Sequence, residues 1–161
     1  MNYLIDTHAH LDFPELYSNL DVIIENAKSN NVMKIITIST NLNKIQKIIQ
    51  ISNDNDIVYF TVGVHPNEVL KDSNFDNYDL ISDISNNLKC VGVGECGLDY
   101  HFGNEDKEKQ KLSFTTQIKV ARDNKLPLII HSRDADKDMI HILENEYRKG
   151  PFKAILHCFS S

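Results

Sequence analysis

The stretch "YLIDTHAH", residues 3–10, places two histidines one residue apart at the end of a short apolar run. On an extended strand the side chains at positions i and i+2 point to the same face, so we expect His8 and His10 to face one point. Two neutral imidazoles that converge in this way make half of a metal site. The stretch predicts a buried first strand that carries metal ligands at its carboxyl end.

Further short apolar runs follow along the chain, with longer and more polar stretches between them. Helical spacing of apolar residues separates these runs, over residues 20–27, 45–52, 73–87, 107–124 and 134–150. Strands that alternate with helices predict βαβ units and a parallel sheet, and hence an α/β fold covering residues 1–161 as one domain. The predicted strands are residues 3–5, 34–38, 57–62, 90–94, 127–131 and 154–157.

The overall composition excludes few functions. The chain has 161 residues and a formal net charge of −6, which argues against a broad basic surface that follows duplex DNA. A phosphate substrate stays open, because bound divalent cations can supply a positive field locally.

Cysteine usage and hydropathy indicate a cellular location. Cys90, Cys96 and Cys158 form no CxxC pair, so reduced thiols are expected rather than a structural zinc site. No apolar stretch approaches the roughly 20 residues that span a bilayer, and the first residues show no secretory signal. We expect a cytoplasmic protein without membrane association.

Most of the predicted strands end in a residue that can bind a metal. Ligands and catalytic groups in parallel α/β folds lie at the carboxyl ends of the strands. A lone histidine there is usually a hydrogen-bonded surface residue, and a lone glutamate can cap a loop or pair with lysine. The concentration of such residues at one end of the sheet favours a metal site instead, with nitrogen and carboxylate donors that suit Zn²⁺ or Mn²⁺ better than Ca²⁺. The residues are His8, His10, His65, Glu95, His131 and His157.

Several stretches together resemble the TatD family of metal-dependent deoxyribonucleases, within the amidohydrolase-like TIM barrels. The resemblance covers essentially the whole chain and implies a TIM-barrel-type (β/α) fold, with about six of the eight strands present here. The matching stretches are "DTHAHLD" (6–12), "VGVHP" (62–66), "VGECGLDY" (93–100), "QKLSFTTQIKVA" (110–121), "PLIIHSRDA" (127–135) and "HCFS" (157–160).

The resemblance implies roles for individual residues and two bound divalent ions (Mg²⁺, Zn²⁺ or Mn²⁺). Glu95 would be the shared, catalytic carboxylate. The implied metal ligands are His8, His10, Glu95, His131 and His157.

The implied partner is DNA, as single strands or strand ends. His65 and Arg133 would contact the substrate, and the arginine fork suits phosphate oxygens. Asp99 and Tyr100 could support the ligands or anchor a loop. Other motif residues are expected to be structural: Gln110, Phe114, Gln117 and Ala121 through packing and buried hydrogen bonds, and Cys96 and Cys158 as small packing residues.

One departure from the family concerns length. The family forms a full eight-stranded barrel of about 250 residues, whereas this sequence stops at Ser161, before two further strands and an aspartate that completes the metal site in the family. It also has "HCFSS" where the family usually has "HCFSG". We expect a fragment of a longer protein, or a shortened member, with two exposed sheet edges.

Three functions follow from these observations. The first is hydrolysis of phosphodiester bonds in DNA by a metal-activated water, as an exonuclease. The second is metal-dependent hydrolysis of an ester or amide, for example in aminoacyl-tRNA. The third is a truncated, non-catalytic metal-binding protein.

Overall fold

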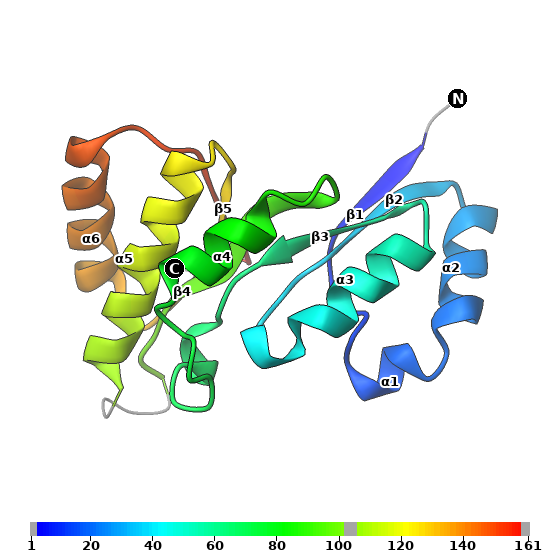
Figure 1. Cartoon of the computed structure of the whole chain (residues 1–161), viewed down its shortest axis with the longest axis horizontal. Helices are drawn as coiled ribbons and strands as arrows, with labels where there is room; N and C mark the ends of the chain where they lie inside the picture. Colours follow the sequence, from blue (N-terminus) through cyan, green and yellow to red (C-terminus); the bar gives the residue numbers. More distant parts are fainter. Residues whose placement is uncertain (1–2, 102–105, 159–161) are drawn as a thin grey trace.

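The computed structural model describes residues 3–101 and 106–158. Six parallel strands form one sheet in chain order, β1-β2-β3-β4-β5-β6, and the sheet curls into a partial barrel with helices outside it (Figure 1). The α/β, barrel-type prediction is confirmed. The strands are β1 (Leu4–Ala9), β2 (Val32–Thr37), β3 (Val58–Val62), β4 (Cys90–Asp99), β5 (Leu128–Arg133) and β6 (Ala154–Leu156).

Each predicted helix is present, and short ones are added. The helices are α1 (Pro14–Tyr17), α2 (Leu20–Ser29), α3 (Ile45–Asp54), α4 (Tyr78–Ser85), α5 (Lys107–Asp123) and α6 (Asp136–Lys149), with 3₁₀ turns η1 (Leu42–Lys44) and η2 (Pro66–Glu68). The helix predicted over residues 73–87 is shorter, because the Asn77 side chain caps α4 by accepting the N–H of Leu80.

The main core lies between β3–β5 and helix α5. Phe60, Phe114, Ile118 and Leu128 are fully buried there. Two glutamines of α5 form hydrogen bonds with backbone from within this core: Gln110 with Asp99 and Gln117 with Val64. Both are structural residues of the motif, as expected. The packing fixes the carboxyl ends of β3, β4 and β5 relative to one another.

The outermost strands are exposed. Leu4 in β1 is 61% exposed and Ile155 in β6 is 56% exposed, because each strand has a neighbour on one side within the described sheet. The expectation of two exposed edges is confirmed, whereas the expectation of a buried first strand is wrong for Leu4 and Ile5.

Strand β4 is longer than predicted and is shaped by two glycines. It pairs with β5 as far as Asp99 opposite Arg133, so "GECGLD" belongs to the strand rather than to the following loop. Gly94 and Gly97 have φ of +137° and +132°, and a Cβ on Gly94 would lie 2.5 Å from the carbonyl oxygen of Ile129. Glycine at these positions lets β4 approach β5 closely on either side of Glu95.

Within the described residues, every helix falls short of the length and apolar character needed to cross a bilayer. The cytoplasmic location stays a prediction.

Candidate metal centre

A pocket of about 450 Å³ opens at the carboxyl ends of the strands. Six of the seven predicted site residues converge there from β1, β4, β5 and the segments that follow β1, β3 and β6. Phe13, Thr40, Glu68 and Cys158 complete the lining. The site residues in the pocket wall are His8, His10, His65, Glu95, His131 and His157.

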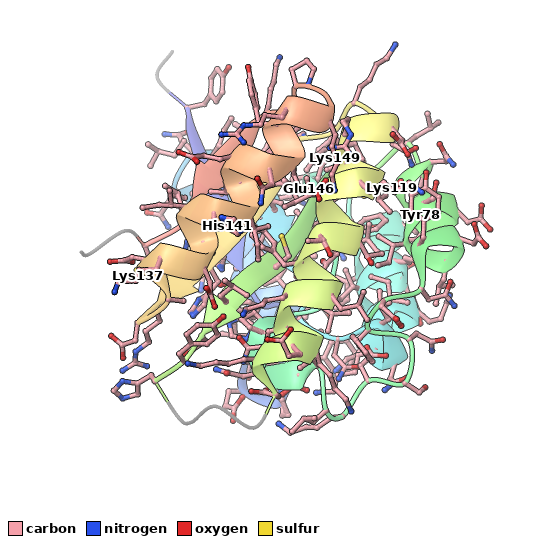
Figure 2. All side chains as sticks on the ribbon, turned by 90° about the vertical axis from the view of Figure 1, so that its left-hand side faces the viewer. Tyr78, Lys119, Lys137, His141, Glu146 and Lys149 are labelled. Atoms are coloured by element: carbon pink, nitrogen blue, oxygen red, sulfur yellow. The ribbon has the colours of Figure 1, made fainter. Side chains whose placement is uncertain are left out.

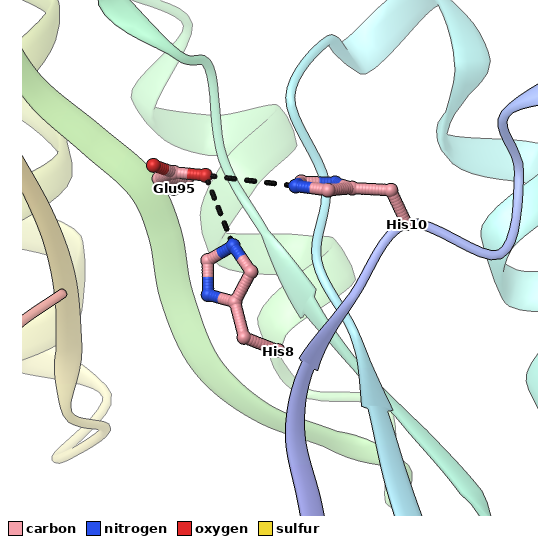
Figure 3. A group of neighbouring side chains, drawn as sticks. All are labelled: His8, His10 and Glu95. Carbon is pink, nitrogen blue, oxygen red and sulfur yellow. Dashed lines mark ion pairs between the residues drawn. The ribbon is translucent and has the colours of Figure 1, made fainter. Parts of the chain in front are cut away.

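Glu95 is at the centre of the pocket and is 4% exposed. Its Oε2 atom lies 3.4 Å from Nε2 of His8 and 4.0 Å from Nε2 of His10 (Figure 3). Its Oε1 atom lies 3.2 Å from Nδ1 of His131 and 3.7 Å from Nε2 of His65. Each carboxylate oxygen therefore faces a pair of imidazole nitrogens.

Glu95 stays ionised at neutral pH. Burial by itself would raise its pKa, yet the hydrogen bonds from His131 and His8 hold the pKa below the usual value of a glutamate. A buried carboxylate among imidazoles is a donor set for a divalent cation, and its two oxygens can serve two ions.

The His10 ring is oriented for a metal ligand. Its Nδ1 lies 3.1 Å from the carbonyl oxygen of Ile38, which can only accept, so Nδ1 carries the proton and Nε2 presents its lone pair. That lone pair and the Glu95 oxygen, both electron-rich, face each other across 4.0 Å. A cation between them would satisfy both, so His8, His10 and Glu95 fit a metal ion.

His131 lies between two carboxylates. Its Nδ1 faces Glu95, and its Nε2 lies 3.1 Å from Oδ2 of Asp99. Burial lowers the pKa of His131, but the two carboxylates outweigh burial and raise it above its usual value. When one nitrogen binds a metal, a carboxylate on the other fixes the ring orientation, and this is the position of Asp99.

His65 also faces Glu95, at 3.7 Å, but its ring carries the proton on the opposite nitrogen to that of His10. Its Nδ1 accepts the backbone N–H of Asn67 at 3.1 Å, so the neutral ring carries its proton on Nε2. Burial lowers the pKa of His65 to about 4, so the ring is neutral at pH 7. His65, Glu95 and His131 are close enough to hold an ion, but the tautomer makes His65 a hydrogen-bond donor towards the pocket.

Two predicted residues lie apart from the close groups. His157 stacks on His8 with ring centroids 3.6 Å apart and an interplanar angle of 9°, and it is outside both close ligand groups of the described residues. Arg133 is exposed at the end of β5, and the pocket lining does not include it.

The structure decides the residues that the sequence left open. Asp99 supports His131, whereas the Tyr100 hydroxyl donates to Asp138 at 2.7 Å, away from the histidines. Cys96 is buried in the core as predicted. Cys158 is exposed and lines the pocket, so its prediction as a packing residue is wrong: it follows β6 in a turn, with φ of +51°.

The chain matches the family described as TatD related DNase over residues 5–161. It is 35% identical over 157 residues to a protein named metal-dependent hydrolase YabD of Bacillus subtilis, covering 98% of this chain and 61% of that protein. It is 32% identical to the human deoxyribonuclease TATDN3, covering 97% of this chain and 60% of that protein. The chain thus spans about three fifths of the length of these relatives.

Solved structures show the same fold. The Escherichia coli TatD homologue YjjV superposes with a TM-score of 0.83 at 27% identity, over 98% of this chain and 61% of that one. A TatD family hydrolase from Entamoeba histolytica superposes with a TM-score of 0.82 at 27% identity, over 99% and 59%. The sequence match, these superpositions and the order of the site motifs agree: the chain belongs to the TatD family.

Proposed function

We propose that the protein hydrolyses phosphodiester bonds in DNA in a reaction that depends on divalent metal ions. The observation that carries this proposal is the pairing of four imidazoles on the two oxygens of one buried carboxylate, Glu95. A relative named metal-dependent hydrolase and another named deoxyribonuclease support the chemistry and the substrate. We further propose that residues 1–161 act as one partial hydrolase domain.

The residues divide into two sets of ligands that share Glu95. His8 and His10 would hold one ion with Glu95, and His131 would hold a second ion with the same carboxylate. His157, the fifth predicted ligand, stacks on His8. The bound metal would lower the pKa of a water molecule and offset the charge of the phosphate. Because Glu95 is buried and ionised, it keeps its negative charge between the two sets at neutral pH.

The substrate would be held by hydrogen bonds beside this carboxylate. The neutral His65 offers its Nε2–H to a phosphate oxygen without the cost of carrying a buried charge. Arg133, outside the pocket wall, would reach a neighbouring phosphate of the strand with its guanidinium fork. Single strands or strand ends fit this proposal, since the net charge of −6 gives no broad surface for duplex DNA.

The test combines metal content with cleavage. Elemental analysis of the purified protein should find a bound divalent metal, and a labelled single-stranded oligonucleotide should be cut from its end. Chelation and the His10→Ala variant should each abolish cleavage. The control is His141→Ala, which removes an exposed histidine from the outer side of α6 (Figure 2) and should leave both readings unchanged.

Two results would overturn the proposal. One is oligonucleotide cleavage that survives both chelation and His10→Ala. The other is cleavage of ester or amide substrates, including aminoacyl-tRNA, by a protein that leaves DNA intact.

A further inference from the structure

We propose that Asn67 is a positioning residue of the metal centre, which orients His65 through its backbone and His131 through its side chain. The inference rests on the proposed function, since it concerns a ligand and a substrate-binding residue of the same site. Asn67 is in the 3₁₀ turn η2, after β3, and it is half-buried.

The first contact fixes a tautomer. The Asn67 N–H donates to Nδ1 of His65 at 3.1 Å, which places the imidazole proton on Nε2, on the side of Glu95. A backbone donor keeps this arrangement whatever side chain follows at position 67, except proline. His65 is thereby committed to donating into the pocket.

The second contact reaches His131 through one oxygen atom. The Asn67 Nδ2 donates at 2.9 Å to Oδ2 of Asp99, and the same Oδ2 faces Nε2 of His131 at 3.1 Å. Asp99 is 3% exposed, so water has little access to replace a missing donor. The His101 N–H holds the other carboxylate oxygen, Oδ1, at 3.0 Å, so the Asn67 amide and this N–H together orient Oδ2 towards the imidazole. His131 in turn presents Nδ1 to Glu95.

The backbone around both ends of this chain of contacts is fixed by helix α5. Gln117 binds the N–H and the C=O of Val64, directly before His65. Gln110 binds the N–H and the C=O of Asp99 in the same two-sided way. With both backbones held, the Asn67 amide adds a side-chain hydrogen bond between η2 and β4 at the pocket.

Asparagine suits this position because it offers a backbone N–H and a neutral side-chain donor of the right length. Aspartate has the same shape but would place a second carboxylate against Asp99 and remove the donor. Alanine removes the donor and keeps the backbone contact. These variants separate the two contacts, since both leave the His65 hydrogen bond intact.

The first readout needs no metal. In ¹⁵N-labelled, chelator-treated protein, the imidazole nitrogen signals report the tautomer and proton exchange of each ring. Asn67→Ala and Asn67→Asp should speed exchange of the His131 Nε2 proton and leave the His65 tautomer unchanged. Unchanged His131 signals in a folded variant would overturn the proposal, whatever the metal affinity.

The second readout is Co²⁺ affinity, measured by competition with a chelator and by the visible Co²⁺ spectrum. Loss of an outer partner of a ligating histidine should weaken binding about 10- to 100-fold. Asn124→Ala is the matched control, because its amide binds Ser82 and Ser85 instead. Wild-type affinity in both Asn67 variants would overturn the inference alone, whereas a wild-type protein that binds no divalent metal would overturn the proposed function.

Discussion

The two halves of the metal centre are held in different ways. His131 and Asp99 lie on β5 and β4, inside the sheet, and hydrogen bonds from η2 and α5 support the buried Asp99. His8 lies on β1, at the edge of the described sheet, and His10 follows it, tied to the Ile38 carbonyl. The core half, with His131, Asp99 and Glu95, is therefore held by contacts inside the protein core. The edge half, with His8 and His10, is held by the pairing of β1 with β2 and by the Ile38 contact.

This difference shows where the site can be disturbed. A change in the core between β4, β5 and α5 should act on His131 and Glu95 together. A change on the outer side of β1 or β6 should leave the buried carboxylate in place, because Glu95 belongs to the core half and meets the edge half only through its Oε2 atom.

Removal of the shared carboxylate should have the largest effect, because it breaks both halves at once. Glu95→Gln keeps the shape and removes the charge that both sets of imidazoles face. Metal occupancy and DNA cleavage should fall by more than about 100-fold, beyond the loss typical of outer partners. Elemental analysis and an oligonucleotide assay measure this.

The matched control for Glu95→Gln is Glu144→Gln on α6, where the side chain is 62% exposed and pairs with Arg148. This control should retain full occupancy and cleavage. If the two variants behave alike, Glu95 is not the residue on which the halves meet.

Truncation of a large side chain should destabilise the protein strongly in the core and only slightly on an edge strand. Phe114 is fully buried against β4, whereas Ile155 on β6 is 56% exposed. Phe114→Ala should lower the free energy of unfolding by about 3–5 kcal/mol, and Ile155→Ala by about 0.5 kcal/mol or less. Urea denaturation at pH 7 measures both, and equal losses would contradict the comparison.

The next prediction concerns the backbone that brings β4 against β5. Gly97→Ala places a Cβ onto the carbonyl oxygen of His131 at a φ of +132°. The backbone strain alone should cost about 1–3 kcal/mol, and metal affinity should fall because the His131 backbone must move.

Gly92→Ala is the control in the same strand, where the nearest atom to the new Cβ is the Pro127 carbonyl oxygen at 3.2 Å. It should cost clearly less in urea denaturation and leave metal affinity near the wild-type value. A Gly92→Ala loss as large as that of Gly97→Ala would argue against the close approach of β4 and β5 at His131.

Much of the fold and of the site could be predicted from local pattern. The alternation of strands and helices, and the placement of His8, His10, Glu95 and His131 at strand ends, follow from apolar runs that end in ligand-type residues, and the family resemblance supplied the barrel that brings them together. The exposure of Leu4 did not follow, because an apolar run has the same pattern at an edge as inside a sheet.

The supporting contacts could not be predicted for a different reason. Asn67 and Asp99 are 32 residues apart, and their hydrogen bond depends on how η2 packs on β4. Arg133 and Cys158 show the same limit: the direction of a side chain after a strand end depends on the turn that follows.

The smallest expected effect is the pH dependence that His65 gives to the unfolding free energy of the metal-free protein. The pKa of His65 is lowered to about 4 by burial, against 6.5 in the unfolded chain, so the unfolded state binds more protons between these values. Stability from His65 is complete above about pH 6.5 and is lost towards pH 4, by at most about 2 kcal/mol between pH 7 and 5.

The raised pKa of His131 acts in the opposite sense, adding stability as pH falls, and it is present in wild type and variants alike. The difference between wild type and His65→Gln in urea denaturation at pH 7 and pH 5 therefore isolates His65, with His141→Gln on α6 as the exposed control. The wild type should lose more stability than His65→Gln on acidification, and an equal loss would mean that burial does not keep His65 neutral.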